Sequence, residues 1–376
     1  MDDINVILIS SVRPEESLSA ALTLHRHLVN RRGIQLHILR AEHHEIVHGR
    51  FHSKIVPRLM RTSARRWGGD IDYLMHTMLP LEKRLAPPHR DTRTVVLTLA
   101  YRSGCWVAQR YAKRHRLPLI VRFDDWWPDI AEVHHPLRKQ LEQRFLELHQ
   151  SADLSVCISE GMLKTLGPHR NARVIFPIPD VKPINSSKCQ DSAREFRVCY
   201  TGNMIDYSNM LADLAQLAVK QTDIRIEFRG RPMWSQALIR EMTQRQLLHD
   251  FASGLAFDDW LGSFHAYLVV MFFDAAHRRR TETCFATKLV DYSRASRPVV
   301  IWAPETSAVV QWAKKSGAAL CVTDPDAGAL LAALAHLKRD KALQLELAER
   351  MRRAYETEFS PVRLQQQFLE GLNSVI

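Results

Sequence analysis

Short apolar runs alternate along the chain with longer stretches in which apolar residues recur every three or four positions. In the first half, these runs predict strands at Ile4–Ile9, Ile34–Leu39, Thr94–Leu99, Leu117–Phe123 and Leu154–Ile158. The amphipathic stretches between them predict helices, the clearest being Glu15–Asn30, Gly104–His115 and Leu137–His149. Strands that alternate with helices are typical of right-handed βαβ units, so we expect a parallel sheet with helices on both faces.

The same alternation resumes after a proline-rich, polar stretch, which predicts a linker over residues 181–193. Beyond it we expect strands at Phe196–Tyr200, Ile224–Phe228, Gly254–Phe257, Ala266–Phe272, Pro298–Trp302 and Ala318–Val322. A helix is expected near Leu330–Leu337, and the tail from Lys341 is helical with an interruption at Ser360–Pro361. The pattern predicts two Rossmann-like, doubly wound domains, over residues 1–180 and 194–355, and a final helical segment over residues 356–376.

Composition limits the class of protein. The 376 residues favour two domains, and 46% hydrophobic with 25% charged residues is ordinary globular composition. No apolar run approaches the roughly 20 residues of a membrane-spanning helix, and the N-terminus does not resemble a signal peptide. The six cysteines form no CxxC pair, which favours free thiols in a reducing compartment. We therefore expect a cytoplasmic protein.

The net charge of +11 suits a polyanionic partner. A phosphorylated donor, an anionic membrane and nucleic acid all fit this charge. Nucleic acid is not expected, because no known binding motif accompanies the charge. The phosphate-binding patterns GxGxxG and GxxxxGK followed by Ser or Thr are absent, which excludes most dinucleotide and P-loop enzymes. In doubly wound folds, ligands bind at the carboxyl ends of the strands, so we expect a site in a cleft between the two domains.

The most informative segment is Glu282–Val300, a loop that enters a helix at about Ala286 and continues to a strand. Thr287 and Lys288 then occupy the first turn of the helix. Free backbone N–H groups, a hydroxyl and an ammonium group together suit a diphosphate. Asp291 follows one turn later, at a spacing suited to ribose hydroxyls.

The sequence ATKLVDYSRASRPVV in this segment resembles the donor-binding motif PTKLLEYLAAGRPVV of family 4 (group 1) GT-B glycosyltransferases. The matching positions are Thr287, Lys288, Leu289, Tyr292, Arg297, Pro298 and Val299. Asp291 replaces the usual glutamate. The resemblance implies a GT-B fold in which the helix N-terminus holds the donor diphosphate and the acidic residue binds the nucleotide ribose.

Further segments resemble the family in the same order, although the motif above is the specific one. Residues 157–167 match a strand-to-helix step, and residues 198–210 match the first donor-domain loop, where Gly202 and Asn203 would admit the donor. Residues 228–232 include Arg229, and residues 255–260 include Phe257 and Trp260, which the resemblance places near the nucleotide base. Residues 121–130 are similar to the DLWPE stretch of bacterial lipid-linked-sugar transferases. The closing helices resemble those that cross back to the N-terminal domain.

Two features depart from the family. Its paired acids follow the pattern E-x7-E, but Thr283 stands where the first acid is expected and Glu282 lies one residue earlier. Glu282 is therefore a candidate contact for the donor sugar, with the stereochemistry left open. The glycine-rich N-terminal loop of the family is replaced by Ser10–Ser17.

These residues predict transfer of a sugar from a nucleotide-diphosphate sugar to a hydroxyl of a glycan or lipid-linked acceptor. Lys288, assisted by Arg229 or Arg279, would stabilise the charge on the leaving diphosphate, and no metal or other cofactor is expected. The resemblance favours retention of configuration. One alternative is inversion, with Asp124 or Asp125 as general base, although aspartates there also suit a helix N-cap. Another is a non-catalytic scaffold with the same fold.

A basic stretch over Arg50–Arg66 contains six basic residues and no acid, interleaved with apolar residues. The pattern fits a helix with one solvated face. It also fits an interfacial helix on the inner face of a membrane, where each basic residue near anionic lipid contributes roughly 1 kcal/mol. The residues that would then face the lipid are Lys54, Arg58, Arg61, Arg65 and Arg66.

Overall fold

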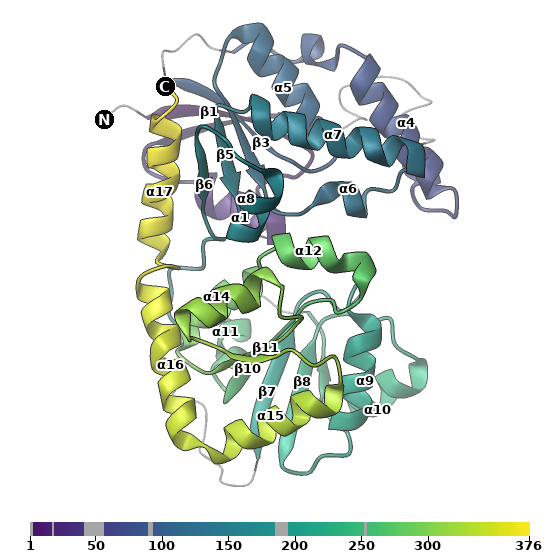
Figure 1. The fold of residues 1–376 in the computed structure, drawn as a ribbon, viewed down its shortest axis with the longest axis vertical. Helices are drawn as coiled ribbons and strands as arrows, with labels where there is room; N and C mark the ends of the chain where they lie inside the picture. The colour runs from purple at the N-terminus through teal and green to yellow at the C-terminus, as the bar shows by residue number, and fades with distance from the viewer. Residues whose placement is uncertain (1–2, 17–18, 41–55, 89–92, 185–194, 252–253) are drawn as a thin grey trace. The chain divides into compact units, whose positions relative to one another are not determined.

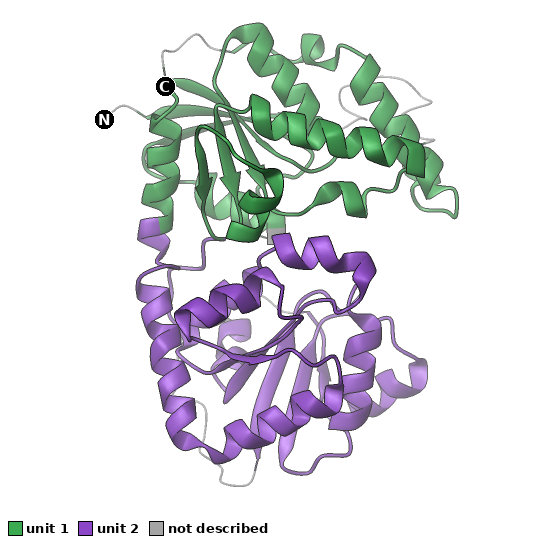
Figure 2. Ribbon diagram, in the orientation of Figure 1, with its two compact units in different colours: residues 1–176, 364–376 green, residues 177–363 purple. Residues whose placement is uncertain are grey.

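The computed structural model describes residues 3–16, 19–40, 56–88, 93–184, 195–251 and 254–376. The chain divides into two compact units (Figure 2). Unit 1 comprises residues 1–176 and 364–376, and unit 2 comprises residues 177–363. Each unit is built on a six-stranded sheet whose paired strands are parallel.

The sheet of unit 1 has the strand order β2-β1-β3-β4-β5-β6. Figure 1 labels β1, β3, β5 and β6 of this sheet. Its strands are β1 (Ile4–Ser10), β2 (Ile34–Arg40), β3 (Thr94–Leu99), β4 (Leu119–Phe123), β5 (Leu154–Cys157) and β6 (Ala172–Val174). Strands β1, β3, β4 and β5 are buried along their whole length, as expected for strands covered on both faces. The helical segments are α1 (Ser19–Leu28), α4 (Arg65–Met78), η1 (Leu81–Arg84), α5 (Gly104–His115), α6 (Trp127–Ile130), α7 (His135–Ser151) and α8 (Glu160–Leu166).

The C-terminal helix α17 (Pro361–Asn373) packs from Leu364 onward with unit 1. Gly371 lies so close to β5 that an added Cβ would be 3.0 Å from the Leu154 side chain. The Asn373 side chain accepts a hydrogen bond of 2.7 Å from Arg93. The end of the chain is therefore part of the core of unit 1.

The sheet of unit 2 has the strand order β12-β11-β10-β7-β8-β9. Its strands are β7 (Phe196–Thr201), β8 (Ile224–Arg229), β9 (Leu248–His249), β10 (Ala266–Val270), β11 (Val299–Trp302) and β12 (Leu320–Val322). The helical segments are α9 (Ser208–Ala218), α10 (Gln236–Gln244), α11 (Leu255–Leu261), η3 (Ala275–His277), α12 (Arg278–Thr283), α13 (Thr287–Tyr292), η4 (Ser293–Ala295), α14 (Ala308–Ser316), α15 (Ala327–Arg339) and α16 (Lys341–Glu356). On one face, alternate residues of β7, β8 and β10 form a core with residues of α9 and α15.

Most predicted elements are confirmed, but the strand expected at Gly254–Phe257 is wrong. Those residues begin α11, in which Phe257, Trp260 and Leu261 recur at helical spacing and Leu261 is buried. The Trp260 ring also packs against Phe264, just after the helix. The short strands β6 and β9 were not predicted. Of the predicted linker 181–193, residues 185–193 lie outside the described part of the chain. None of the described helices combines the length and apolar character that a transmembrane segment requires.

Candidate functional site

The loops that follow β7 and β8 approach each other at two glycines in unit 2. Gly202 has a φ of +112° and Gly230 a φ of +151°, both in the region that L side chains rarely adopt. A Cβ on Gly230 would lie 2.7 Å from the carbonyl oxygen of Gly202. The Gly202 N–H donates to the carbonyl of Arg229, at 3.2 Å. The backbones that follow β7 and β8 are therefore in direct contact, with no side chain between them.

Lys288, in the first turn of α13, projects to the same place. Its Nζ donates a hydrogen bond of 2.9 Å to the Tyr200 hydroxyl and lies 4.1 Å from the centroid of that ring. A Cβ on Gly202 would come within 3.1 Å of the same Nζ. The absence of a Cβ at position 202 therefore leaves space for the Lys288 ammonium group.

The charge on Lys288 lacks compensation. In the part of the chain that the structure describes, Lys288 forms no ion pair with a carboxylate. Its side chain is partly buried, and the loss of hydration lowers the pKa of Lys288 to about 7. An anion bound beside Nζ would supply the missing opposite charge.

Helix α13 is held at the end of β7 by Tyr292. The Tyr292 hydroxyl accepts a hydrogen bond from the Thr201 N–H at 3.1 Å and lies 2.8 Å from the Thr201 hydroxyl. The Tyr292 ring stacks on Tyr267 of β10, with centroids 4.8 Å apart. The helix begins at Thr287, close to the predicted start, and its N-cap, Ala286, supplies no capping side chain. Asp291 lies in the same helix and is partly buried.

Asn203 has a local role in the structure. Its side-chain oxygen accepts the N–H groups of Ile205 and Asp206, at 3.0 and 3.1 Å. Its backbone carbonyl accepts the Tyr200 hydroxyl, at 2.6 Å. Asn203 therefore shapes the loop that carries Gly202. Arg280 of α12 forms an ion pair of 3.0 Å with Asp206 of the same loop.

Arg229 and Trp260 lie together beside this loop. The Arg229 guanidinium is 4.3 Å from the Trp260 ring centroid and donates to the carbonyl of Asp250 at 2.8 Å. Partial burial lowers the pKa of Arg229. Phe257 stacks on Trp260, with centroids 6.2 Å apart. The structure thus brings together the three residues predicted at or near the nucleotide.

Glu282 and Arg279 lie on α12, where the sequence departs from the family pattern. The Glu282 carboxylate pairs with Arg278 of the same helix at 2.8 Å. Arg279 is partly buried, and its carbonyl accepts the hydroxyl of the buried Thr283 at 2.8 Å. The position at which the family has its first acid is therefore filled by a threonine bonded to its own helix.

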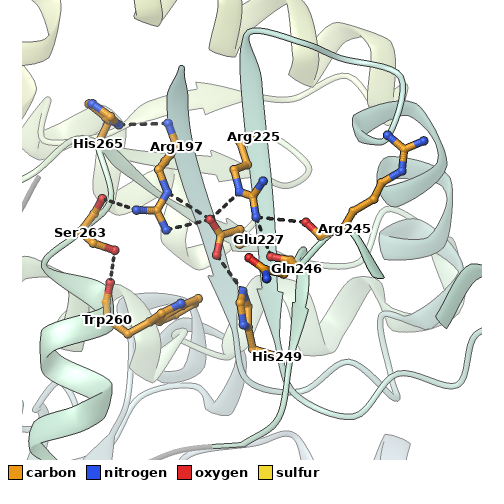
Figure 3. Close-up of polar contacts among 9 residues, drawn as sticks. All are labelled: Arg197, Arg225, Glu227, Arg245, Gln246, His249, Trp260, Ser263 and His265. Carbon is orange, nitrogen blue, oxygen red and sulfur yellow. Dashed lines mark hydrogen bonds and ion pairs between the residues drawn. The ribbon is translucent and has the colours of Figure 1, made fainter. Parts of the chain in front are cut away.

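A buried charge cluster next to Trp260 was not predicted (Figure 3). Glu227 of β8 is 2% exposed and contacts Arg197 at 2.8 Å, Arg225 at 2.9 Å and His249 at 2.7 Å. Burial opposes ionisation of Glu227, but the hydrogen bonds and positive charges of these partners hold its pKa at about 2. The alternation of Arg225, Glu227 and Arg229 in one strand was the available signal, since alternate residues share a face.

The candidate bases of the inverting alternative lie at the end of β4 in unit 1. Asp124 is 8% exposed and pairs with Arg122 at 2.8 Å. Burial raises the pKa of Asp124, and the positive charge of Arg122 acts in the opposite direction. Neither Asp124 nor Asp125 caps α6, because Trp126 occupies its N-cap position.

The predicted membrane-facing arginines are only partly on one helix. Arg58, Arg61, Arg65 and Arg66 are exposed, and Lys54 lies outside the described residues. The chain turns between residues 60 and 64 before α4 begins at Arg65. Within the described ranges, no group of three or more His, Cys, Asp or Glu side chains is placed to hold a metal ion.

The two parallel sheets and the returning C-terminal helix define a GT-B fold, that of a large class of glycosyltransferases, and solved structures confirm it. The chain is similar to HepE from Anabaena in complex with UDP-glucose, with a TM-score of 0.65 and 12% identity over 99% of this chain and 100% of that one. It is similar to the UDP-forming trehalose-phosphate synthase from Burkholderia xenovorans, with a TM-score of 0.63 and 12% identity over 99% and 100%. Sucrose-phosphate synthase from Thermosynechococcus elongatus gives a TM-score of 0.62 and 12% identity over 99% and 98%. The chain matches no family model and no curated protein sequence.

Proposed function

We propose that this chain is a glycosyltransferase that moves a sugar from a UDP-sugar to an acceptor hydroxyl. The observation that carries the proposal is Lys288, an uncompensated ammonium group with a pKa lowered to about 7, at the glycine-lined ends of β7 and β8. The fold supports the proposal, because ligands of doubly wound domains bind at the carboxyl ends of the strands. The choice of UDP rests on HepE, whose solved structures contain UDP and UDP-glucose.

In the proposed reaction, the donor diphosphate lies between Lys288, the Gly202 backbone and the first turn of α13. When the glycosidic bond breaks, negative charge grows on the leaving UDP. The attraction between the Lys288 ammonium group and this charge is strong, because the partly buried ammonium group has little hydration to lose. The chain's own cations neutralise the diphosphate in this scheme, without a metal ion. Arg279 of α12 is the candidate for a second positive charge.

The nucleoside would lie on the Arg229 side of the same site. Trp260 and Phe257 offer aromatic surface beside the Arg229 guanidinium, which suits a pyrimidine base. Asp291, one turn after Thr287 in α13, is the proposed partner of the ribose hydroxyls. Glu282 is the proposed contact for the donor sugar, whose hydroxyls would replace Arg278 as the partner of the Glu282 carboxylate.

We propose retention of configuration. The resemblance of residues 286–300 to family 4 (group 1) GT-B glycosyltransferases supports it, and Asp124, whose pKa is raised by burial, stays a candidate general base of the inverting alternative. A retaining reaction needs no such base, since the leaving phosphate can take the acceptor proton. The anomeric configuration of the product, read by NMR, decides between retention and inversion.

The test is UDP release from UDP-sugars in the presence of glycan and lipid-linked acceptors. We expect turnover by the natural protein and a loss of at least about 100-fold in Lys288→Met. The matched control is Lys338→Met, which removes an ammonium group of the same unit that pairs with Asp223. Equal turnover by Lys288→Met and the control would refute the role of Lys288. Nucleotide binding without turnover on any donor would favour the non-catalytic scaffold.

A further inference from the structure

Arg294 of η4 donates hydrogen bonds to three separate segments of unit 2. Its Nε donates to the carbonyl of Asp291, near the end of α13, at 3.3 Å. Its Nη1 donates to the carbonyl of Lys182 at 2.8 Å. Its Nη2 donates to the carboxylate of Asp258 in α11 at 2.9 Å. A single guanidinium group, on a side chain only 4% exposed, therefore joins α13, α11 and the segment with which unit 2 begins.

These three contacts require an arginine. Each nitrogen of the guanidinium group bonds to a different segment, and the three donors are spread over one rigid plane. The ammonium group of a lysine is a single point on a flexible stem, so it cannot replace the three. In the motif PTKLLEYLAAGRPVV, which residues 286–300 resemble, alanine stands at the position of Arg294. The contacts are thus a property of this chain and not of the motif.

The two helices that Arg294 joins carry the residues proposed for the two ends of the donor nucleotide. Helix α13 carries Lys288 for the diphosphate and Asp291 for the ribose. Helix α11 carries Phe257 and Trp260 for the base. A nucleotide has a fixed reach, so the separation of α11 from α13 decides whether one molecule can contact both helices at once.

Asp258 and Trp260 use different sides of α11. At 100° per residue, the two positions lie about 160° apart around the helix. One side is bonded to Arg294, and the other presents the Trp260 ring to the Arg229 guanidinium at 4.3 Å. The ion pair of Asp258 with Arg294 is largely shielded from water, which strengthens it. This contact therefore helps to determine where α11 holds its aromatic side chains.

The backbone of Arg294 is itself held in place. Its carbonyl accepts the N–H of the buried Ile184 at 3.1 Å. Helix α16 packs against η4, and its Tyr355 hydroxyl donates to the carbonyl of Val181 at 3.3 Å. The segment 181–184 is thus fixed from both sides. Arg294 cannot shift freely with either α11 or α13, so it sets the place of both.

We propose that Arg294 is a positioning residue of the donor site, which holds α11 and α13 at the separation that one UDP molecule spans. The inference rests on the proposed function and adds a residue to its site. Because Arg294 is buried, it acts through the two helices and not by contact with the donor. Inorganic pyrophosphate would reach α13 but not α11, so its binding needs no fixed separation of the helices.

The test is isothermal titration calorimetry of the full chain with UDP and, separately, with inorganic pyrophosphate. The variant is Arg294→Lys, which keeps the charge and loses the fork. Its matched control is Arg350→Lys, which removes a guanidinium group that donates to the Gly317 carbonyl at 3.2 Å, in the same unit. In Arg294→Lys we expect the affinity for UDP to fall at least about tenfold and that for pyrophosphate to change less than about twofold. The control should bind both ligands as the natural protein does.

Variants of Asp258 test the same contact from α11. Asp258→Ala should also weaken UDP binding and leave pyrophosphate binding nearly unchanged. Asp258→Asn keeps an oxygen acceptor for Arg294 and should restore most of the lost affinity. The double variant Arg294→Lys, Asp258→Ala should bind UDP within about threefold of Arg294→Lys alone, because both substitutions remove one shared contact.

Three results would overturn the role of Arg294 alone, given UDP binding by the natural protein. They are an unchanged UDP affinity in Arg294→Lys, an equal loss of affinity for UDP and pyrophosphate, and losses that multiply in the double variant. A lower melting temperature with an unchanged ratio of the two affinities would make Arg294 a structural residue only. Absence of UDP binding by the natural protein would instead refute the proposed function, and this inference with it.

Discussion

The affinity for UDP is expected to fall as the pH rises above about 7, because Lys288 loses its proton in that range. Burial lowers the pKa of the free Lys288 to about 7. A diphosphate beside Nζ favours the charged form and raises that pKa again. UDP binding is therefore coupled to proton uptake at every pH between the pKa of Lys288 in the free protein and its pKa in the UDP complex. The terminal phosphate of UDP titrates near pH 6 and is already charged over this range.

The magnitude follows from this linkage. With a free pKa of about 7, and Lys288 charged throughout this range when UDP is bound, the dissociation constant rises about 50-fold between pH 7 and pH 9. The assay is isothermal titration calorimetry with UDP in buffers of different ionisation enthalpy, which also counts the protons taken up. The reasoning predicts close to one proton per UDP at pH 9.

Two substitutions serve as controls for the assignment to Lys288. Lys288→Arg keeps a charge that does not titrate, so its affinity should be nearly constant from pH 7 to pH 9. Lys288→Met should bind weakly and without this pH dependence. A constant affinity of the natural protein, or an unchanged slope in Lys288→Met, would refute the reasoning.

Four further predictions test other parts of the structure. Gly202→Ala should weaken UDP binding at least about tenfold in calorimetry, because its Cβ would lie 3.1 Å from the Lys288 ammonium at a φ of +112°. Glu227→Gln should lower the free energy of unfolding in urea by about 3 kcal/mol, since it breaks a buried charge cluster. The stability that Glu227 contributes should be complete above about pH 4.5 and be lost as the pH falls through about 2, because its folded-state pKa is lowered. Gly69→Ala should lower the melting temperature by more than 5 °C, since its Cβ would overlap the Glu132 carbonyl and such overpacking costs about 3 kcal/mol. An unchanged value in any of these measurements would contradict the corresponding contact.

The charge on Lys288 should lower the stability of the unliganded protein, although it strengthens the binding of UDP. The folded-state pKa is lowered from 10.5 to about 7, so charging Lys288 costs about 5 kcal/mol more in the folded chain than in water, as an upper bound. This penalty is complete below pH 7 and disappears as the pH rises toward 10.5. Lys288→Met should therefore raise the melting temperature at pH 7 in scanning calorimetry while it weakens UDP binding. A lowered melting temperature would contradict the burial of an uncompensated charge.

The regular elements of the fold were predictable because buried strands and amphipathic helices have distinct periods. The predicted bounds of β3 and α5 are those observed, Thr94–Leu99 and Gly104–His115. The two-residue strand β9 has no period to detect, and its partner β8 alone determines its place. At α11, the short apolar run after Gly254 is also typical of a strand start, and the helical repeat depends on Trp260 and Leu261 farther along the chain.

The candidate site was predictable in its motif but not in its contacts. Thr287, Lys288 and Asp291 share one short helix, as their spacing predicts. The hydrogen bond from Lys288 to Tyr200 joins residues 88 positions apart, and only the strand order of unit 2 brings them together. The ion pair of Asp124 with Arg122 had a local signal, because alternate residues of a strand share a face, but their burial depends on tertiary packing.

The most direct test of the central claim is a thermal-shift panel with UDP, GDP, ADP, CDP and TDP at pH 7. A ligand that binds the folded state alone at about 100 times its dissociation constant adds about 2.7 kcal/mol to its stability. The account predicts that UDP raises the melting temperature of the natural protein and of Lys338→Met, and that the rise is absent in Lys288→Met. No rise with any of the five nucleotides, or an equal rise in Lys288→Met, would contradict a donor site at Lys288.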